Sequence, residues 1–302
     1  MDSARSAVWK RIVEERAPKL GVQIWPDCTN PLAVSYLVTW EVPDRVRDQF
    51  PNLRAVFVNG AGVDHIDMSK IPEDLPVVRM VEPGISAGMS EYVVMAVLAA
   101  HRNLVHYIAQ QRNHVWKDLP SLPAGQRTVG VMGAGVLGQS VLAALSSFGF
   151  KLRAWSRSGR QIPNVTCFSG RQALPEFLSG TDFLVCLLPL TDETKGILNK
   201  RVFEALPMGA VVINASRGGN LVEVDLLAAL DSGQLSAAIL DVCEREPLAS
   251  GNELWSHPRV LITPHIATRT QPQTAAEVVL ANIGRHLEGA CLTNVVDRQR
   301  GY

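Results

Sequence analysis

The chain has 302 residues and carries 29 basic and 29 acidic side chains, so its formal net charge is zero. This length is enough for two domains, and 47% hydrophobic with 19% charged residues is typical of a globular chain rather than a disordered one. A chain without net charge gives no electrostatic reason to expect nucleic acid or an anionic membrane as a partner.

Residues 1–90 alternate between helical and strand patterns. Residues 8–17 have the helical spacing of apolar side chains, whereas residues 35–40, 53–64 and 76–81 contain short apolar, β-branched runs that are typical of strands. This alternation predicts a small α/β unit at the start of the chain.

A long helical segment follows this unit. Its pattern runs over residues 90–116 and predicts two helices, before Pro120 and Pro123 interrupt the chain. Beyond residue 128, short apolar strand segments alternate with helical ones, which predicts a parallel sheet covered on both faces. Residues 273–288 are helical again and are expected to return to the first unit. Two crossings would then leave a cleft at the junction of two domains.

The most informative motif lies in residues 129–138. A β-branched strand pattern runs into three glycines with GxGxxG spacing, and an amphipathic helical segment follows. Glycines at these positions let the backbone turn sharply and approach a pyrophosphate, which the helix N-terminus attracts. We therefore predict a dinucleotide site formed by Gly133, Gly135, Val136, Leu137 and Gly138.

The end of the next strand predicts which dinucleotide binds. NAD-binding proteins carry an acidic residue there that accepts hydrogen bonds from the ribose 2′-OH. This chain has Ser156, Arg157 and Ser158 instead, and no acidic residue occurs between Asp118 and Glu176. An arginine binds a 2′-phosphate through charge-assisted hydrogen bonds, whereas a carboxylate repels it. The sequence therefore predicts a preference for NADP(H) over NAD(H).

Three later polar residues are candidates for catalysis. Arg217, Glu246 and His265 each follow a predicted strand, at the carboxyl edge where open parallel sheets bind their ligands. Reduction of a 2-oxo acid needs a cation for the carboxylate, which suits Arg217, and a proton donor for the carbonyl oxygen, which suits His265. A neighbouring Glu246 would orient the imidazole and favour its protonated form. This chemistry requires no metal ion.

These segments resemble the D-isomer-specific 2-hydroxyacid dehydrogenases. The resemblance rests on VGVMGAGVLG, LLPLTDETKGILN, INASRGGNLVEVDLLAALDSG, LDVCEREPL and TPHIA, in this order, over about residues 53–302. It implies an α/β fold with two doubly wound parallel-sheet domains, in which a Rossmann nucleotide-binding domain is inserted into a flavodoxin-like substrate domain. We expect the substrate domain to comprise residues 1–91 and 270–302, and the NAD(P)-binding domain residues 92–269.

The resemblance also assigns roles to single positions. It implies that Arg217, Glu246 and His265 are catalytic and that Asp241 binds the nicotinamide amide. Backbone N–H groups of the loop with Asn59, Gly60, Ala61 and Gly62 would bind the substrate carboxylate, and Trp40 is a further candidate for the substrate pocket. The implied cofactor-lining residues are Leu188, Pro189, Asn214, Ala215, Ser216, Asp241, His265 and Ala267.

Within the family, the chain is most similar to the A-type glyoxylate/hydroxypyruvate reductases. The shared features are the strand end WSRS, the segment LWSHPRVLITPH and the C-terminal VDRQRGY. They imply reduction of glyoxylate to glycolate and of hydroxypyruvate to D-glycerate with NADPH. The family also implies a homodimer formed through residues 92–125, in which Trp116 is a candidate to reach the partner's site.

Two departures from the family pattern stand out. Family members open with a short strand, whereas residues 1–5 contain no apolar strand, so the first strand of the substrate domain is expected to be missing. Cys243 replaces the aromatic residue that is usual before the glutamate-rich turn.

Two alternative functions remain open from the sequence. One is an NAD-linked dehydrogenase of the same family that oxidises a hydroxy acid such as 3-phosphoglycerate, and the other is a nucleotide-sensing regulator that keeps the fold without turnover. We expect a cytoplasmic location, because the five cysteines are scattered without a CxxC pair and the N-terminus lacks the apolar core of a signal peptide. Charges interrupt the short apolar runs, so no membrane span is expected.

Overall fold

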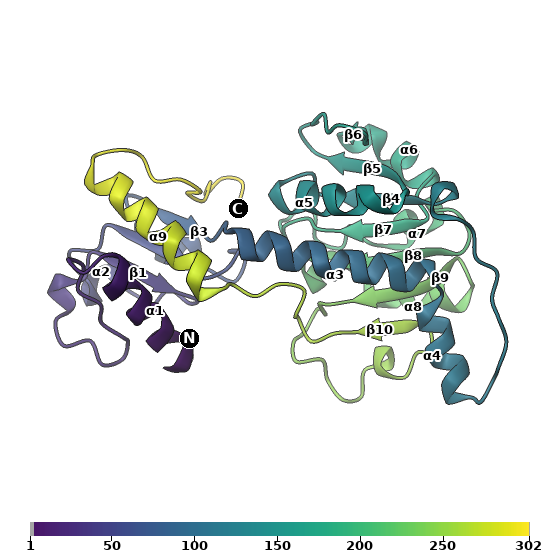
Figure 1. The fold of residues 1–302 in the computed structure, drawn as a ribbon, viewed down its shortest axis with the longest axis horizontal. Coiled ribbons are helices and arrows are strands. Elements are labelled where there is room, and N and C mark those ends of the chain that lie inside the picture. Colours follow the sequence, from purple (N-terminus) through teal and green to yellow (C-terminus); the bar gives the residue numbers. More distant parts are fainter. Residues whose placement is uncertain (1–2, 302) are drawn as a thin grey trace. The chain divides into compact units, whose positions relative to one another are not determined.

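The computed structural model describes residues 3–301 and divides into two compact units (Figure 1). Unit 1 combines Met1–Ile85 with Arg269–Tyr302, and unit 2 is the continuous segment Ser86–Thr268. The first boundary proposed from the sequence, at residue 91, lies inside helix α3 (Pro83–His101). Unit 2 is thus inserted into the chain of unit 1.

Unit 2 contains a seven-stranded parallel sheet within the described residues. Its strands are β4 (Thr128–Met132), β5 (Lys151–Ser156), β6 (Thr166–Ser169), β7 (Phe183–Cys186), β8 (Ala210–Asn214), β9 (Leu235–Leu240) and β10 (Val260–Ile262). They lie in the order β10-β9-β8-β7-β4-β5-β6, so the order reverses between β4 and β7. This is the strand order of a Rossmann fold with one added edge strand, and the reversal is where such sheets bind dinucleotides. The predicted fold class is confirmed.

Helices cover both faces of this sheet (Figure 1). Besides α3, they are α4 (Leu104–Arg112), α5 (Val136–Leu145), α6 (Leu174–Ser179), α7 (Lys200–Ala205) and α8 (Glu223–Asp231). Side chains alternate along each strand, so Val131 packs in one core with α3 and α5, while Met132 packs in the other with α6, α7 and α8. The predicted pair of helices is confirmed, because Asn103 adopts a left-handed conformation (φ 56°) between α3 and α4.

Helix α3 is long and apolar enough to cross a membrane when judged by length and composition alone, with a mean hydropathy of 1.3. No membrane span was expected from the sequence, because charges interrupt its apolar runs. In the structure, however, 44% of its apolar window is buried inside the protein, and Val93, Ala96 and Val97 belong to the core of unit 2. Packing against the sheet accounts for the apolar character of this helix.

Unit 1 has a smaller parallel sheet. Within the described residues it contains β1 (Tyr36–Thr39), β2 (Ala55–Val58) and β3 (Val77–Arg79), in that order, with α1 (Ser3–Arg16), α2 (Val46–Gln49) and α9 (Pro272–Leu287). The predicted C-terminal helix is confirmed as α9, which lies beside α1 and is joined to it by an ion pair between Arg16 and Glu277 (3.4 Å). The phenol oxygen of Tyr36 on β1 lies 3.0 Å from His286 Nδ1 on α9.

The start of unit 1 is helical. Residues 3–16 form α1, so the described part of the chain contains no strand before this helix. Residues 1–2, which also belong to the segment expected to lack a strand, lie outside the described residues.

Candidate active site

The glycine loop between β4 and α5 leaves open space in front of a helix N-terminus. Gly133 has a φ of 110°, and a Cβ at Gly138 would lie 1.8 Å from the Gly133 oxygen, so glycine is required for the turn and for the close packing of α5. Gly135 is the N-cap of α5, and a Cβ there would meet no protein atom within 4 Å. The backbone at Gly135 is therefore open to a phosphate, as a dinucleotide loop requires.

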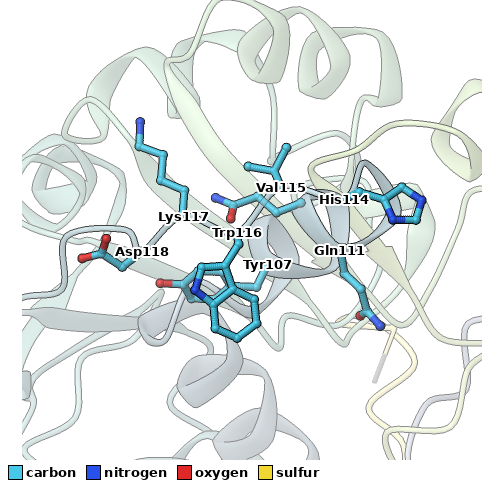
Figure 2. A pocket seen from close by; sticks show the side chains of 8 residues that line it. Tyr107, Gln111, His114, Val115, Trp116, Lys117 and Asp118 are labelled. Atoms are coloured by element: carbon cyan, nitrogen blue, oxygen red, sulfur yellow. The ribbon is translucent and has the colours of Figure 1, made fainter.

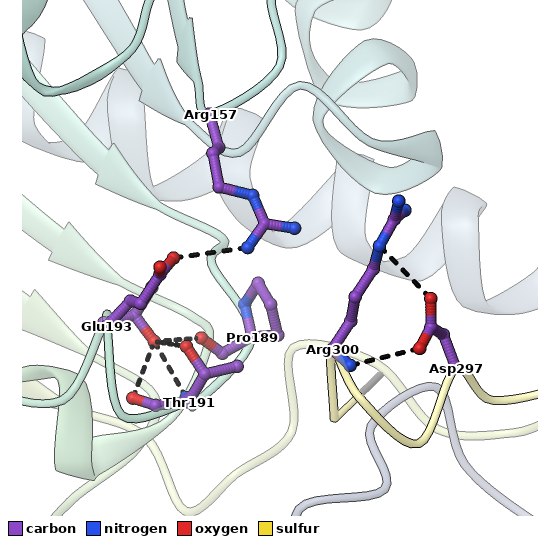
Figure 3. Close-up of polar contacts among 7 residues, drawn as sticks. Arg157, Pro189, Thr191, Glu193, Asp297 and Arg300 are labelled. Atoms are coloured by element: carbon purple, nitrogen blue, oxygen red, sulfur yellow. Dashed lines mark hydrogen bonds and ion pairs between the residues drawn. The ribbon is translucent and has the colours of Figure 1, made fainter.

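Arg157 lies in the turn after β5 and forms an ion pair. Its Nη1 lies 3.2 Å from Oε2 of Glu193, and both side chains are more than half exposed (Figure 3). Glu193 comes from the loop after β7, so an acidic residue lies beside Arg157 although none is close in the sequence. The chain directly after β5 has no acidic residue, but the fold brings Glu193 from another loop to this part of the surface.

Arg217 lies in a tightly ordered loop after β8. Asn214, which is fully buried, donates from Nδ2 to the carbonyl oxygen of Arg217 (3.1 Å) and accepts from the N–H of Ser216 at Oδ1 (3.2 Å). Arg217 is half-buried and donates from Nη1 to the carbonyl oxygen of Ser216 (2.8 Å). A Cβ on Gly218 would lie 1.9 Å from the carbonyl carbon of Cys243, so this loop packs backbone to backbone against the loop after β9.

Glu246 and His265 are brought together from the loops after β9 and β10. Nδ1 of His265 lies 2.7 Å from Oε2 of Glu246, while Oε1 of Glu246 accepts the N–H of Cys243 (3.0 Å). His265 has a φ of 53°, which is uncommon outside glycine and marks a constrained loop. Because the carboxylate holds Nδ1, Nε2 is the ring nitrogen left to exchange a proton with a ligand. The His265 side chain is 42% exposed and accessible for this role.

Asp241 organises the loop after β10. It is 1% exposed; its Oδ1 accepts from Thr263 Oγ1 (2.7 Å) and the N–H of Ile266 (2.8 Å), and its Oδ2 accepts from the N–H of Ala267 (2.8 Å). Behind it, the hydroxyl of Tyr92 on α3 lies 2.7 Å from Thr263 Oγ1. Since a carboxylate only accepts, Thr263 donates to Asp241 and accepts from Tyr92. Burial raises the pKa of Tyr92 to about 12, so its hydroxyl keeps its proton at neutral pH.

Cys243, the residue that departs from the family pattern, is buried beside this site. Burial raises the pKa of its thiol to about 11, and the negative charges of Glu223, Glu246 and Asp241 act in the same direction. The thiolate is the reactive form of cysteine, so Cys243 is inert at neutral pH. Within residues 3–301, no three His, Cys, Asp or Glu side chains are grouped so as to hold a metal ion.

In unit 1, the predicted substrate loop follows β2. The N–H groups of Asn59 and Gly60 donate to backbone carbonyl oxygens of the unit at 2.8 Å each. In the described part of the chain, no intramolecular hydrogen bond engages the N–H of Ala61 or Gly62. Of the four predicted donors, Ala61 and Gly62 are therefore the two that are available to an anion.

Trp40 supports the same loop. A Cβ on Gly60 would lie 2.6 Å from the indole ring, so this glycine is required by the packing of Trp40. The indole stacks on the ring of His65 with centroids 4.0 Å apart and remains 43% exposed. The structure thus places Trp40 against the predicted substrate loop.

Known proteins resemble the chain over nearly its whole length. Residues 94–267 match the family described as "D-isomer specific 2-hydroxyacid dehydrogenase, NAD binding domain". The chain is also 42% identical to glyoxylate/hydroxypyruvate reductase A of Yersinia enterocolitica, over 97% of this chain and 96% of that protein. The chain belongs to the D-isomer-specific 2-hydroxyacid dehydrogenase family.

Solved structures of this 2-hydroxyacid dehydrogenase family have the same fold. A family member from Xanthobacter autotrophicus, solved with NADPH and MES, has a TM-score of 0.92 and 37% identity, covering 98% of this chain and 96% of that one. The NADPH-dependent glyoxylate/hydroxypyruvate reductase of Sinorhizobium meliloti, solved with NADP and sulfate, has a TM-score of 0.90 and 38% identity, with the same coverage.

For this 2-hydroxyacid dehydrogenase, the predicted residues of unit 2 gather at one edge of the sheet. They lie in or directly beside the loops at the carboxyl ends of the strands, as shown by Gly133 after β4, Arg157 after β5, Leu188 after β7, Arg217 after β8, Asp241 after β9 and His265 after β10. The predicted residues of unit 1, Trp40 and the 59–62 loop, likewise lie together. The pairing of Glu246 with His265 was predicted, because both residues follow strands of one parallel sheet and a carboxylate would orient the imidazole.

Three residues around the dehydrogenase site were missed. Glu193 lies within the motif LLPLTDETKGILN, which was noted without a role for the acid. Thr263 stands two residues before His265, and Tyr92 lies on a helix in an apolar segment. Only the hydroxyl of Thr263, so near a candidate histidine, offered a signal in the sequence; the other two required the fold.

Proposed function

We propose that this dehydrogenase is an NADPH-dependent reductase of small 2-oxo acids, which converts glyoxylate to glycolate and hydroxypyruvate to D-glycerate. The observation that carries the proposal is the Glu246–His265 pair, with its 2.7 Å contact, at the same sheet edge as the open glycine loop and Arg157. An acid–base pair beside a dinucleotide loop is the arrangement that carbonyl reduction requires.

Different residues of the chain have different roles in this reaction. When bound, NADPH supplies a hydride to the carbonyl carbon. Arg217 holds the substrate carboxylate and polarises the carbonyl group, and His265 gives a proton from Nε2 to the carbonyl oxygen, which becomes the hydroxyl of the product. Glu246 orients the imidazole and stabilises its positive charge before the proton leaves.

The cofactor fits the residues that are present. The open backbone at Gly135 and the N-terminus of α5 would hold the pyrophosphate, and Arg157 with Ser156 and Ser158 would hold the 2′-phosphate. We assign lining of the nicotinamide end to the loops with Leu188, Pro189, Ala215, Ser216, Asp241 and Ala267. Asp241 already accepts three hydrogen bonds, so its main contribution is to position the loop after β10.

Unit 1 is proposed as the substrate domain. The N–H groups of Ala61 and Gly62 would bind the substrate carboxylate, and Trp40 would line the pocket. Under this proposal the domains are residues 1–91 with 270–302 and residues 92–269. All five cysteines are free, which supports the proposed cytoplasmic location, since disulfides are rare in reducing compartments.

An assay of NADPH oxidation tests the proposed function. It measures the loss of NADPH absorbance in the presence of glyoxylate or of hydroxypyruvate. We expect turnover with both acids and a higher kcat/KM with NADPH than with NADH. His265→Ala should lower kcat/KM by about 100- to 10,000-fold, because it removes the proton donor. Arg217→Ala should lower it severely as well, whereas the exposed Arg171→Ala in the same unit should not.

Two results would contradict this function. A higher kcat/KM with NADH would indicate the NAD-linked alternative. Binding of NADPH without turnover on any small 2-oxo acid would indicate a nucleotide-sensing regulator. Near-full activity of His265→Ala would remove the role assigned to the histidine even if the wild-type protein is a reductase.

We also propose that the protein is a homodimer formed through α4 and the segment after it. A groove of about 700 Å³ is lined by Tyr107, Gln110, Gln111, His114, Val115, Trp116, Lys117 and Asp118 (Figure 2). Trp116 is fully exposed, and Leu104, Val115 and Leu122 are each about half exposed on the same stretch of chain. Exposed apolar side chains concentrated in one segment favour a protein partner, and a second copy of the chain is the partner that the family implies.

A further inference from the structure

Glu193 and Arg157 are paired before any cofactor is considered. The ion pair (3.2 Å) joins side chains that are 57% and 53% exposed. Pairs this exposed contribute little to stability and exchange partners readily. The guanidinium of Arg157 is also the group proposed to bind the 2′-phosphate, so the carboxylate and the phosphate would bind the same cation.

The loop that carries Glu193 is held in place on both sides of this residue. The hydroxyl of Thr194 donates to the carbonyl oxygen of Pro189 (2.6 Å) and accepts from the N–H of Thr191 (2.8 Å). The fully buried Asn220 donates from Nδ2 to the carbonyl oxygen of Thr194 (3.1 Å). The backbone of Glu193 is therefore fixed beside Arg157, and only the side chain is free to turn away.

We infer that Glu193 is a specificity-determining residue, which competes with the 2′-phosphate for Arg157 and so weakens binding of NADP(H) relative to NAD(H). Binding of the phosphate must break the ion pair and leave a carboxylate near a phosphate dianion, and both effects oppose binding. NAD(H) carries a hydroxyl in place of the phosphate and leaves the pair intact. The inference rests on the proposed role of Arg157 in binding the 2′-phosphate.

Calorimetric titration of the full chain tests this inference directly, without relying on turnover. The probes are NADP⁺ and NAD⁺, together with the fragments 2′,5′-ADP and 5′-AMP, which differ by the 2′-phosphate alone. Glu193→Gln keeps the size of the side chain and removes its charge. Asp192→Asn is the matched control, because it removes the same charge from the exposed neighbouring residue.

We expect Glu193→Gln to lower the Kd for NADP⁺ and for 2′,5′-ADP by about fivefold, the scale of one exposed ion pair, and to leave NAD⁺ and 5′-AMP unchanged. Asp192→Asn should have a smaller effect. In Arg157→Gln, binding of NADP⁺ should weaken. Adding Glu193→Gln to that variant should lower the Kd for NADP⁺ by a smaller factor than the same substitution does in the wild-type protein, because the competition acts through Arg157.

The outcomes separate the inference from the function on which it rests. If the wild-type protein binds NADP⁺ no more tightly than NAD⁺, the proposed cofactor is wrong and the inference fails with it. If the wild type prefers NADP⁺ but Glu193→Gln leaves its Kd unchanged, or changes it no more than Asp192→Asn does, only the inference is overturned.

Discussion

Tyr92, Thr263 and Asp241 form a partly buried row of hydrogen bonds behind the loop that carries His265. Asp241 fixes the loop through the N–H groups of two residues that directly follow the histidine, Ile266 and Ala267. Since catalysis is sensitive to small misplacements of a proton donor, a residue that never touches the substrate can still influence the rate through this row. Tyr92 is the end of this row opposite Asp241.

Tyr92→Phe should therefore slow the reaction more than it destabilises the protein. Loss of the hydroxyl leaves a lone pair of Thr263 unsatisfied and should lower the free energy of unfolding by about 1 kcal/mol. We expect kcat to fall while the Kd for NADP⁺ stays the same. Tyr36→Phe, which loses one hydrogen bond to His286 in unit 1, should match the loss of stability but keep kcat. Equal kcat in both variants would show that the row is only structural.

One pair of residues that the fold brings together could be predicted from the sequence, and another could not. Glu246 and His265 follow successive strands of one parallel sheet, so their meeting was predictable from strand order. Glu193 follows β7 and Arg157 follows β5, and these strands are not neighbours in the sheet because β4 lies between them. Their ion pair depends on the length and course of two loops, which no periodic pattern in the sequence encodes.

At the scale of elements, the strands that were easiest to predict are buried on both sides. Every residue of β7 and β8 is buried, and apart from Asn214 at the end of β8 each strand is a continuous apolar run in the sequence. The edge strand β6 was missed, because its end residues, Thr166 and Ser169, are exposed and it has no apolar run. Edge strands are short and half-solvated, so their sequence pattern resembles that of a loop.

The glycine loop offers a test in which the effect on binding separates from the effect on folding. Gly135→Ala places a methyl group in space that no protein atom occupies, at an ordinary negative φ, so the melting temperature should hold while the Kd for NADP⁺ rises. Gly138→Ala places the methyl group 1.8 Å from the oxygen of Gly133 and should destabilise unit 2 as well. Thermal unfolding and calorimetric titration of both variants measure this difference. Unchanged affinity in a folded Gly135→Ala protein would contradict the dinucleotide site.

In unit 1, one buried carboxylate serves the first turns of two helices. Glu82 is 2% exposed; Oε2 accepts the N–H of Gly84 in α3 and the hydroxyl of Thr274 in α9, while Oε1 accepts the N–H of Gln271 at the start of α9 (3.2 Å). A negative charge at a helix N-terminus also interacts favourably with the positive end of the helix dipole. Glu82 thus ties together the two segments through which the chain leaves and re-enters unit 1.

Removing this carboxylate should be costly. Glu82→Ala removes a buried carboxylate and leaves its three donors, which are at most partly buried, without this partner. We expect the free energy of unfolding to fall by about 2–4 kcal/mol in a urea titration. The exposed Glu73→Ala in the same unit should change it by less than about 0.5 kcal/mol. Equal effects of the two substitutions would show that the hydrogen bonds of Glu82 contribute nothing specific.

At the scale of the whole molecule, the helical segment 273–288 and the family resemblance together predicted a nucleotide-binding unit inserted into a unit built from both chain ends. The alternation of strand and helix patterns was visible in both parts of the chain because each unit has its own parallel sheet and its own apolar core. The surface proposed for a second subunit lies within residues 92–125, the segment that the resemblance implied. The structure adds that exposed apolar side chains are concentrated on α4 and the chain after it.

Substitution of Trp116 distinguishes a free surface from a subunit interface. We expect sedimentation equilibrium to give the mass of two chains for the wild-type protein, and Trp116→Glu to weaken the dimer by at least about 2 kcal/mol, as is usual for a central aromatic residue of an interface. Met208→Glu is the control, because Met208 is 76% exposed in unit 2 outside the proposed interface. It should leave the mass of two chains unchanged, since an exposed methionine outside the interface loses no contact with the partner. A wild-type monomer, or a dimer that Trp116→Glu and Met208→Glu affect equally, would contradict an interface centred on α4.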